Sequence, residues 1–381
     1  MKNSKKVSVK KIVSVVAVAV AIGAAATVTA QAATGVFNPA FGEIFAGQPA
    51  NGVFPGSDVS VKSNDLDVEF VGVTGDETEM YSIYNITKKD GSNFVESTED
   101  YCFLGTNAKM EVSESAFKKL RLMMDGSRGM SDGVSYDFVD SKTIRATVVF
   151  SDTAGCIKGE RLTVNDTDTS IYHIDEVLYS EKSDTELGCT KYMEENKALI
   201  NQKKATFKDN QFIIPIYGKD GIYRLAVTTV TTIPFEYELG VTLNYKTTEK
   251  TFSEAAGKKF RAMKSDWTVK NVKAGSFSIR IDAETDNKTN DGLDLADQEN
   301  RTQEQMNKYL NTDEGLKAEI TLKDGTKISA QASSQNSTEA DGHNESSWIL
   351  TYCTYENAGA MYAIDANEIV SVTCGGTELI K

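Results

Sequence analysis

The feature that most constrains the fold of this chain is the alternation of apolar and polar residues in short segments. Residues 67–73 and 80–86 alternate with a period of two and flank a polar, glycine-containing stretch at 74–78. Because successive side chains of a strand point to opposite faces of a sheet, this pattern predicts a β-hairpin with one buried face. A turn sequence at 88–92 ends the second strand.

Similar β-branched segments recur along most of the chain, separated by Gly, Asp and Asn. Short strands with turns between them are typical of sandwiches rather than of helix-covered parallel sheets. The sequence therefore predicts a mostly β fold with two tandem Ig-like β-sandwich domains and a few short helices. The expected helices cover residues 114–124, 191–202 and 302–310. Further strands are expected at 134–138, 143–150, 161–164, 211–217, 223–232, 235–245, 267–269, 275–281, 316–322, 327–330, 348–355, 362–364, 369–373 and 378–380.

Length and a change in composition divide the chain into two domains. The 381 residues exceed an ordinary single domain of roughly 100–200 residues. Between residues 247 and 264 the sequence becomes polar and lacks strand signals. We therefore expect a β-sandwich domain with insertions at 34–255 and a C-terminal β-sandwich domain at 256–381.

Residues 1–33 have the composition of an export segment. Five lysines and no acidic residue lie among residues 1–11, an apolar run follows at 12–26, and small residues at 30–33 suit a signal peptidase. Residues 12–32 would also span a bilayer, which needs about 20 apolar residues. Residues 1–33 are thus predicted to be a signal peptide or an N-terminal membrane anchor. Either reading makes the rest of the chain extracytoplasmic, because the lysines stay on the cytoplasmic side.

The rest of the chain is strongly acidic. The whole sequence has 41 Lys and Arg against 55 Asp and Glu, a net charge of -14, and five of the lysines lie in the export segment. Such a surface repels nucleic acid and anionic lipid, so we expect no nucleic-acid partner. Contact with the membrane is expected only through the N-terminal segment, if it remains uncleaved. The hydrophobic content of 40% supports packed cores rather than disorder.

The cysteines do not form a metal-binding pattern. Structural zinc needs four Cys or His ligands at short paired spacings, whereas this chain has no CxxC pair and two histidines. Cys353 and Cys374 lie on two strands expected to be neighbours, and they are the first candidates for a disulfide. Buried, unpaired thiols are the alternative, and an odd count leaves at least one thiol over. No pairing is assigned among Cys102, Cys156, Cys189, Cys353 and Cys374.

The two histidines do not accompany a recognisable nucleophile. His173 lies in an expected strand, and His343 lies in an expected polar loop at 333–345. The chain lacks the serine, zinc-protease and cysteine-protease signatures, and its many carboxylates are interpreted as solvated surface charge. We therefore expect no catalytic residues and no enzymatic activity.

Ligand sites of other kinds also lack support in the sequence. The stretch 286–294 looks like a calcium loop, but an EF-hand requires ligands that positions 287, 289 and 298 do not supply. Both Trp residues lie in strands where a sandwich core normally holds them. Tyr81, Tyr84, Tyr237 and Tyr245 lie in alternating strands and are expected to be packed. No cofactor-binding or metal site is therefore expected, and carbohydrate binding is a minor hypothesis.

Several short segments resemble a known family. Residues 35–45, 267–269, 322–326 and 365–372, together with Trp348, resemble the extracytoplasmic region of Gram-positive anti-sigma-factor-like membrane proteins, whose outer parts are domains of unknown function. The resemblance covers most of the chain after the export segment and implies an ectodomain next to a membrane helix. Signalling members have a cytosolic sigma-binding domain before that helix, whereas about eleven residues precede it here. We therefore do not extend the family's sigma-factor binding to this chain.

Three hypotheses of function follow. The first is a non-enzymatic, exported cell-envelope protein, secreted or held at the cell surface, that acts as a spacer or binds a protein or cell-wall ligand. The second is an envelope-sensing ectodomain of a membrane-anchored signalling protein. The third is a secreted hydrolase. Cleavage discriminates between the first two, because a mature N-terminus at Ala33 makes transmembrane signalling impossible.

Overall fold

The computed structural model describes most of the chain after residue 52. The described residues are 41, 45–47, 53–118, 131–151, 154–182, 187–217, 222–246, 249–262, 265–286, 316–340, 343–353 and 361–381. Residues 1–33, the helix expected at 302–310 and nearly all of the calcium-like loop lie outside them. The described part is mostly β, in several antiparallel sheets, which confirms the predicted fold class. No helix within it has the length and apolar character needed to cross a bilayer.

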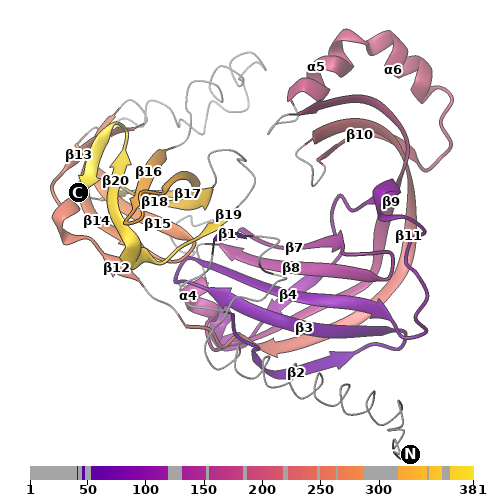
Figure 1. The fold of residues 1–381 in the computed structure, drawn as a ribbon, viewed down its shortest axis with the longest axis horizontal. Helices are drawn as coiled ribbons and strands as arrows, with labels where there is room; N and C mark the ends of the chain where they lie inside the picture. The colour runs from indigo at the N-terminus through magenta and orange to yellow at the C-terminus, as the bar shows by residue number, and fades with distance from the viewer. Residues whose placement is uncertain are drawn as a thin grey trace, which may run out of the picture.

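The first unit is a sandwich of a 4-stranded sheet on a 6-stranded sheet (Figure 1). The inner faces of the two sheets share one core, in which Tyr84 and Val148 of one sheet are buried with Val164 and Leu239 of the other. The predicted hairpin at 67–73 and 80–86 is confirmed, and its strands are the first two of the 4-stranded sheet. The 4-stranded sheet has the order β3 (Leu66–Gly75), β4 (Glu79–Lys88), β8 (Thr143–Ser151) and β7 (Ser131–Phe138).

The 6-stranded sheet contains two strands that are much longer than the sequence predicts. These are β9 (Arg161–Lys182) and β11 (Ile222–Thr242), which pair along their length. The sequence indicated separate short strands because threonines and Pro234 interrupt the alternation. The other members are β10 (Gln211–Tyr217) beside β11, β5 (Tyr101–Cys102) and β6 (Lys109–Val112) beside β9, and β2 (Ser57–Lys62) beside β11.

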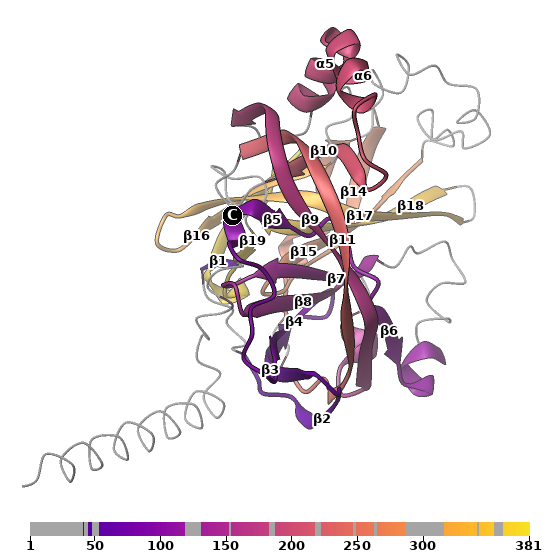
Figure 2. The ribbon, with the colours of Figure 1, turned by 90° about the vertical axis from the view of Figure 1, so that its right-hand side faces the viewer.

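The long pair bends away from the sandwich. The register between β9 and β11 shifts at three places, one of them next to Pro234. A β-bulge bends its strand and increases the local twist, and a bulge also tolerates proline, which lacks the N–H of a regular ladder. Beyond the sandwich the two strands and β10 curve over as an arch, formed by residues 173–182, 211–217 and 222–229 (Figure 2).

Two short helices cover one face of the arch. They are α5 (Leu187–Glu195) and α6 (Lys197–Lys204), in place of the single helix expected at 191–202. Cys189 and Ile200 of the helices pack with Leu225 of β11 in a small separate core. The arch is therefore supported by its own cluster in addition to the main-chain ladder. Shorter helical segments are α4 (Ala154–Ile157) and the 3-10 turn η1 (Thr98–Asp100).

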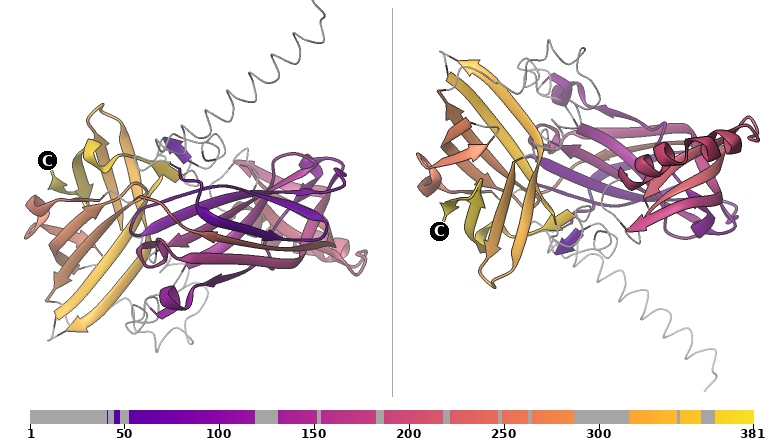
Figure 3. Two further views of the ribbon diagram at one scale, coloured as in Figure 1. Left: turned by 90° about the horizontal axis from the view of Figure 1, so that it is seen from below. Right: turned by 90° about the horizontal axis from the view of Figure 1, so that it is seen from above.

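The second unit is one continuous 11-stranded sheet wrapped around a single core (Figure 3). Its ends approach each other: Lys258 Nζ donates to the Glu378 carbonyl at 3.3 Å, and Lys250 Nζ donates to the Ile369 carbonyl at 3.3 Å. Trp267 and Trp348 are each 1% exposed and pack edge to face, with ring centroids 4.8 Å apart. Both Trp residues thus belong to the core, as expected.

After residue 265 each strand of this sheet overlaps a predicted segment, but β14 and β17 are longer than predicted and β18 begins earlier. The main path is β12 (Lys250–Thr251), β14 (Ser265–Ala274), β15 (Ser278–Thr285), β18 (His343–Cys353), β17 (Lys327–Ala340), β16 (Lys317–Leu322), β20 (Ile369–Cys374) and β21 (Thr377–Ile380), with β13 (Lys259–Ala262), β19 (Met361–Ala363) and β1 (Phe45–Gly47) attached beside it.

Two segments expected to lack strands do contain them. Residues 247–264 include β12, a 3-10 turn η2 (Ser253–Ala255) and β13, and Phe252 and Phe260 are buried in the second core. The two cores therefore divide between Tyr245 and Phe252, a few residues before the expected boundary at 255/256. The polar loop expected at 333–345 lies in the β17–β18 hairpin. Main-chain pairing does not require apolar side chains, so this hairpin lacks a hydrophobic signature.

The proposed neighbours Cys353 and Cys374 do not lie on adjacent strands. Strands β17 and β16 separate β18 from β20 in the sheet, and Cys374 is a buried free thiol. The expectation that these two strands are neighbours is therefore wrong, because order along the chain does not give order in the sheet. Cys102, Cys156 and Cys189 are also free thiols.

A buried junction joins the two units. Phe41, Tyr81 and Phe277 pack there with Ala363, and the rings of Tyr81 and Phe277 have centroids 5.1 Å apart. Strand β1 pairs in parallel with β19 of the second unit. The segment that follows the N-terminal region is thus held at the place where the units meet.

Polar groups complete this junction. Asp76, at the start of the β3–β4 turn, accepts hydrogen bonds from the N–H groups of Thr78 at 2.9 Å, Glu79 at 2.8 Å and Phe277 at 2.9 Å. Burial raises the pKa of Asp76 above its ordinary value, although these hydrogen bonds act in the opposite direction. Glu79 accepts a hydrogen bond from Thr351 Oγ1 at 3.0 Å. The units are therefore connected by direct hydrogen bonds as well as by apolar contact.

Candidate functional site

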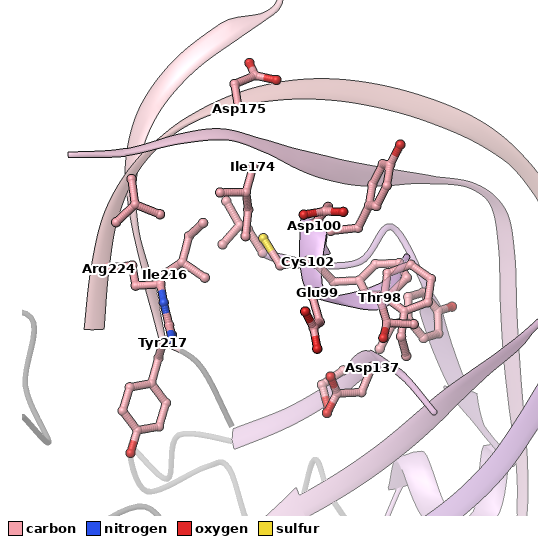
Figure 4. Close-up of a pocket in the computed structure, with 18 of the residues that line it drawn as sticks. Thr98, Glu99, Asp100, Cys102, Asp137, Ile174, Asp175, Ile216, Tyr217 and Arg224 are labelled. Carbon is pink, nitrogen blue, oxygen red and sulfur yellow. The ribbon is translucent and has the colours of Figure 1, made fainter. Parts of the chain in front are cut away.

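A large groove lies beneath the arch. Its volume is about 1130 Å³, which exceeds the usual range of roughly 300–1,000 Å³ for small-molecule sites. Figure 4 shows side chains from both sides directed toward this space. The lining residues are 98–105, 134–138, 174–177, Ile216, Tyr217 and Arg224.

The arch provides one wall of the groove. Ile216 of β10 and Arg224 of β11 are directly paired across the two strands, so their side chains lie on the same face. Ile174 of β9 is directed into the groove from the same wall (Figure 4). Tyr217, at the end of β10, is 46% exposed at the margin. This wall combines apolar side chains with one guanidinium group.

The turn η1 provides the opposite wall. Strand β5 pairs with β9 through Tyr101 and Cys102, which holds the preceding turn beside the arch. Ser97 caps this turn, because its Oγ accepts the N–H of Glu99 at 3.4 Å. Figure 4 shows Glu99 and Asp137 on the side opposite Arg224. This wall is acidic.

Aromatic side chains form the floor. Phe103 packs against Tyr136 and Phe138, with centroid distances of 5.7 Å and 4.6 Å. Tyr136 and Phe138 are buried in the core of the first unit. The floor is thus part of the sandwich core and is apolar.

A chain of phenols continues from the floor into the sandwich. Tyr136 donates to Asp166 Oδ2 at 2.8 Å, its hydroxyl lies 2.6 Å from that of Tyr237, and Tyr237 lies 2.8 Å from the hydroxyl of Tyr84. Burial raises the pKa of all three tyrosines and that of Asp166. The phenols therefore stay protonated and fix the aromatic floor through hydrogen bonds.

The thiol of the groove is not activated. Burial raises the pKa of Cys102 to about 11, whereas a nucleophilic cysteine requires a lowered pKa. Cys102 is thus a protonated thiol within the acidic wall at neutral pH.

His173 lies on the other face of the arch. It contacts Asp175 with Nδ1 and Oδ1 2.7 Å apart, and Asp175 Oδ2 accepts from Thr229 Oγ1 at 2.5 Å and from Gln211 Nε2 at 3.0 Å. Partial burial opposes ionisation of Asp175, but these hydrogen bonds lower its pKa overall. Figure 4 shows Asp175 directed away from the groove and Ile174 directed into it. The interpretation of His173 as a strand residue agrees with its position in β9, and His343 begins β18.

The carboxylates of the groove are spread apart. Within the described ranges, no group of three or more His, Cys, Asp or Glu side chains is arranged to hold a metal ion. Glu176 forms an ion pair with Lys203 at 2.5 Å. The arrangement therefore offers separate acidic contacts along a wall.

The sequence did not predict this groove. Its residues come from separate segments with no motif spacing, and they meet because β9 and β11 extend beyond the sandwich. The available signal was the acidic pair Glu99–Asp100 directly before an aromatic and apolar stretch at 101–104. Such a signal is common on an acidic surface, so the groove becomes visible only in three dimensions.

No family model and no curated protein matches the chain. A solved structure described as the conserved domain protein from Bacillus anthracis is similar, with a TM-score of 0.34 and 10% sequence identity over 86% of this chain and 76% of that chain. Similarity at this level assigns neither a family nor a function.

Proposed function

We propose that this chain is a non-enzymatic, exported protein of the cell envelope that binds its ligand in the groove beneath the arch. The observation that carries the proposal is the groove itself, which has a volume of about 1130 Å³ and is built on the core of the first unit. Large concave sites with an apolar lining and a few polar groups are the usual place for ligands. The composition of residues 1–33 supports export.

The chemistry of the groove supports binding rather than catalysis. Its thiol has a raised pKa of about 11, and the His173–Asp175 pair is directed to the opposite face of β9. Nucleophilic catalysis requires a base within hydrogen-bonding distance of the nucleophile. These positions do not favour the hydrolase hypothesis.

Co-sedimentation with envelope material tests the proposal. Gly105 lines the groove, and a Cβ added there meets no atom within 4 Å, so the backbone has room for a side chain and Gly105→Trp adds bulk at the groove. We expect the wild-type chain to sediment with insoluble envelope from the producing cells and Gly105→Trp to lose most of this binding. Asn64→Trp, at an exposed turn outside the groove, is the control. Equal sedimentation of Gly105→Trp and wild type, or an exclusively cytosolic native protein, would refute the proposal.

A second candidate is the envelope-sensing ectodomain. The observation in its favour is Phe41, which is buried at the junction with Phe277 and Ala363 and lies eight residues after the predicted export segment at 1–33. A displacement of either unit would act on the segment nearest the membrane. Mass spectrometry of the native protein discriminates between the candidates: an intact residue 1–33 segment supports sensing, and a mature N-terminus at Ala33 rules it out.

A further inference from the structure

We infer that the groove binds an extended peptide that carries lysine or arginine side chains. This inference rests on the proposed function, because it names the class of ligand for the same groove. Four properties of the groove lead to it: the sign of its charges, their spacing, its aromatic floor and its size.

The first property is charge complementarity. The carboxylates on the groove side are Glu99, Asp100 and Asp137, and they lie opposite one guanidinium group, that of Arg224. Of the other acidic lining residues, Asp175 is directed away from the groove and Glu176 is paired with Lys203. The whole chain has a net charge of -14. A cleft lined by one sign of charge concentrates ligands of the opposite sign. The groove therefore favours a cationic ligand.

The second property is the spacing of the carboxylates. They do not converge on one point, since no metal-holding group is present among the described residues. Asp175 and Glu176 have protein partners in His173 and Lys203, whereas Glu99 and Asp100 lie exposed on the turn η1. Separate acidic contacts suit a ligand whose positive charges are distributed along its length better than they suit a single ion.

The third property is the apolar floor. Phe103 is half-buried and presents aromatic surface beneath the acidic wall, and Tyr136 and Phe138, which are buried in the core, support it from below. Lysine and arginine bury their aliphatic stems on apolar surface while the charged group stays at the polar rim, and their cations are attracted to aromatic rings. The same groove thus accommodates both parts of a basic side chain.

The size of the groove sets the length of the ligand. About 1130 Å³ exceeds what one amino acid or a simple amine requires. A peptide of several residues fills this volume, and apolar side chains between the basic ones would contact Ile174 and Ile216. An extended peptide therefore accounts for the charge, the floor and the volume together.

Fluorescence anisotropy with purified protein tests the inference. The probe is a fluorescein-labelled decapeptide of alternating lysine and valine, with glutamate-for-lysine and serine-for-lysine versions as comparison peptides. We expect the lysine peptide to bind, the other two not to bind, and the dissociation constant to rise with salt. The double variant Glu99→Gln/Asp100→Asn should weaken binding about fivefold or more, because it removes two charge contacts.

The matched control removes the same charge elsewhere. Asp67 and Glu69 are exposed on β3, outside the groove, so Asp67→Asn/Glu69→Gln changes the net charge equally. We expect this control to bind the lysine peptide within twofold of wild type. Equal weakening by both double variants, or equal binding of the glutamate peptide, would overturn the inference.

The outcome is separable from that of the proposed function. If Gly105→Trp abolishes sedimentation with envelope material while the lysine peptide fails to bind, the groove is a binding site for another class of ligand and only the inference falls. If the lysine peptide binds and Gly105→Trp leaves that binding unchanged, the peptide does not occupy the groove. This result would also refute the inference.

Discussion

Asp76 shows how one carboxyl group joins two structural units. Its Oδ1 accepts the N–H groups of Thr78 and Glu79 within the first unit, and its Oδ2 accepts the N–H of Phe277 in the second. Asp76 is fully buried. Removing an acceptor from a buried N–H costs more than the hydrogen bond contributes, because the N–H loses water as well.

We expect Asp76→Asn to destabilise the protein by about 1–3 kcal/mol. The amide retains an oxygen for Thr78 and Glu79, but its NH2 group then faces the Phe277 N–H, and two donors cannot pair. Urea denaturation measures the free energy of unfolding. Asp90→Asn is the control, because Asp90 caps the exposed turn at Ser92 and an exposed change normally stays within about 0.5 kcal/mol. Equal effects of the two substitutions would contradict the assignment.

The same side chain gives a pH dependence of defined sign. Burial raises the pKa of Asp76 above the ordinary value of 3.8. At pH values between 3.8 and this raised pKa, Asp76 therefore holds a proton in the native state that it releases in the unfolded chain. The contribution of Asp76 to stability therefore falls as pH rises through this window. We expect the cost of Asp76→Asn to be largest near pH 4 and to shrink toward neutral pH in a series of urea titrations. A cost that grows with pH would show that the pKa is lowered.

Tyr237 holds the middle of the phenol chain beneath the groove. Its hydroxyl lies between those of Tyr84 and Tyr136, and Tyr84 is fully buried. We expect Tyr237→Phe to reduce the free energy of unfolding by about 1–3 kcal/mol, because a buried hydroxyl loses its partner. Tyr217→Phe, at a side chain that is 46% exposed, should change it by less than about 0.5 kcal/mol. Thermal denaturation of both variants is the measurement, and similar melting temperatures would argue against a structural role for the three hydrogen-bonded tyrosines.

At the scale of elements, the closure of the second sheet depends on a glycine turn. Gly375 has a φ of 54°, and a Cβ added there would lie 2.5 Å from the carbonyl oxygen of Arg261 on β13. Gly376 has a φ of 75°, but a Cβ there meets no atom within 4 Å. The two glycines thus share the left-handed conformation and differ in their contact with the opposite end of the sheet.

Alanine substitutions at the two glycines separate these effects. We expect Gly376→Ala to cost about 1–2 kcal/mol, the price of the left-handed conformation for an L-residue. Gly375→Ala should cost at least about 1 kcal/mol more, because β13 must also move. Equilibrium denaturation compares the two variants directly. If they are equally stable, the ends of the sheet do not pack as closely as described.

The hairpins were predictable from the sequence, whereas the long strands were not. The alternation at 67–73 and 80–86 and the Asp324-Gly325 turn each specify local pairing, and both appear in the structure. The length of β9 and β11 depends on bulges and on Pro234, which look like strand ends in sequence. The polar β17–β18 hairpin depends on main-chain pairing, for which side-chain periodicity gives no signal.

The groove was not predictable for a related reason. Glu99 and Arg224 face the same space although they are far apart in sequence. They approach only because β5 pairs with β9 and β11 continues past the sandwich. Sequence periodicity specifies which face of a strand is buried, but it does not specify where a strand bends away from its partner sheet.

At the scale of the whole molecule, the junction should make unfolding cooperative. Each unit has its own core, but a shared cluster and the Asp76 hydrogen bonds link the two. We expect a single transition in differential scanning calorimetry. Phe277→Ala, which removes an aromatic contact across the junction, should separate it into two transitions, whereas Phe235→Ala in the first core should lower one transition without dividing it. Two resolved transitions in the wild-type protein would contradict a coupled junction.

Strands β9 and β11 belong both to the buried core of the first unit and to the wall of the groove. A collective bending of the arch would therefore strain the same ladder that stabilises the sandwich. We therefore expect the wall to be rigid in the free protein, so that the proposed binding loses little conformational entropy on the protein side. The rate of capture should consequently follow diffusional encounter rather than a slow rearrangement of the protein.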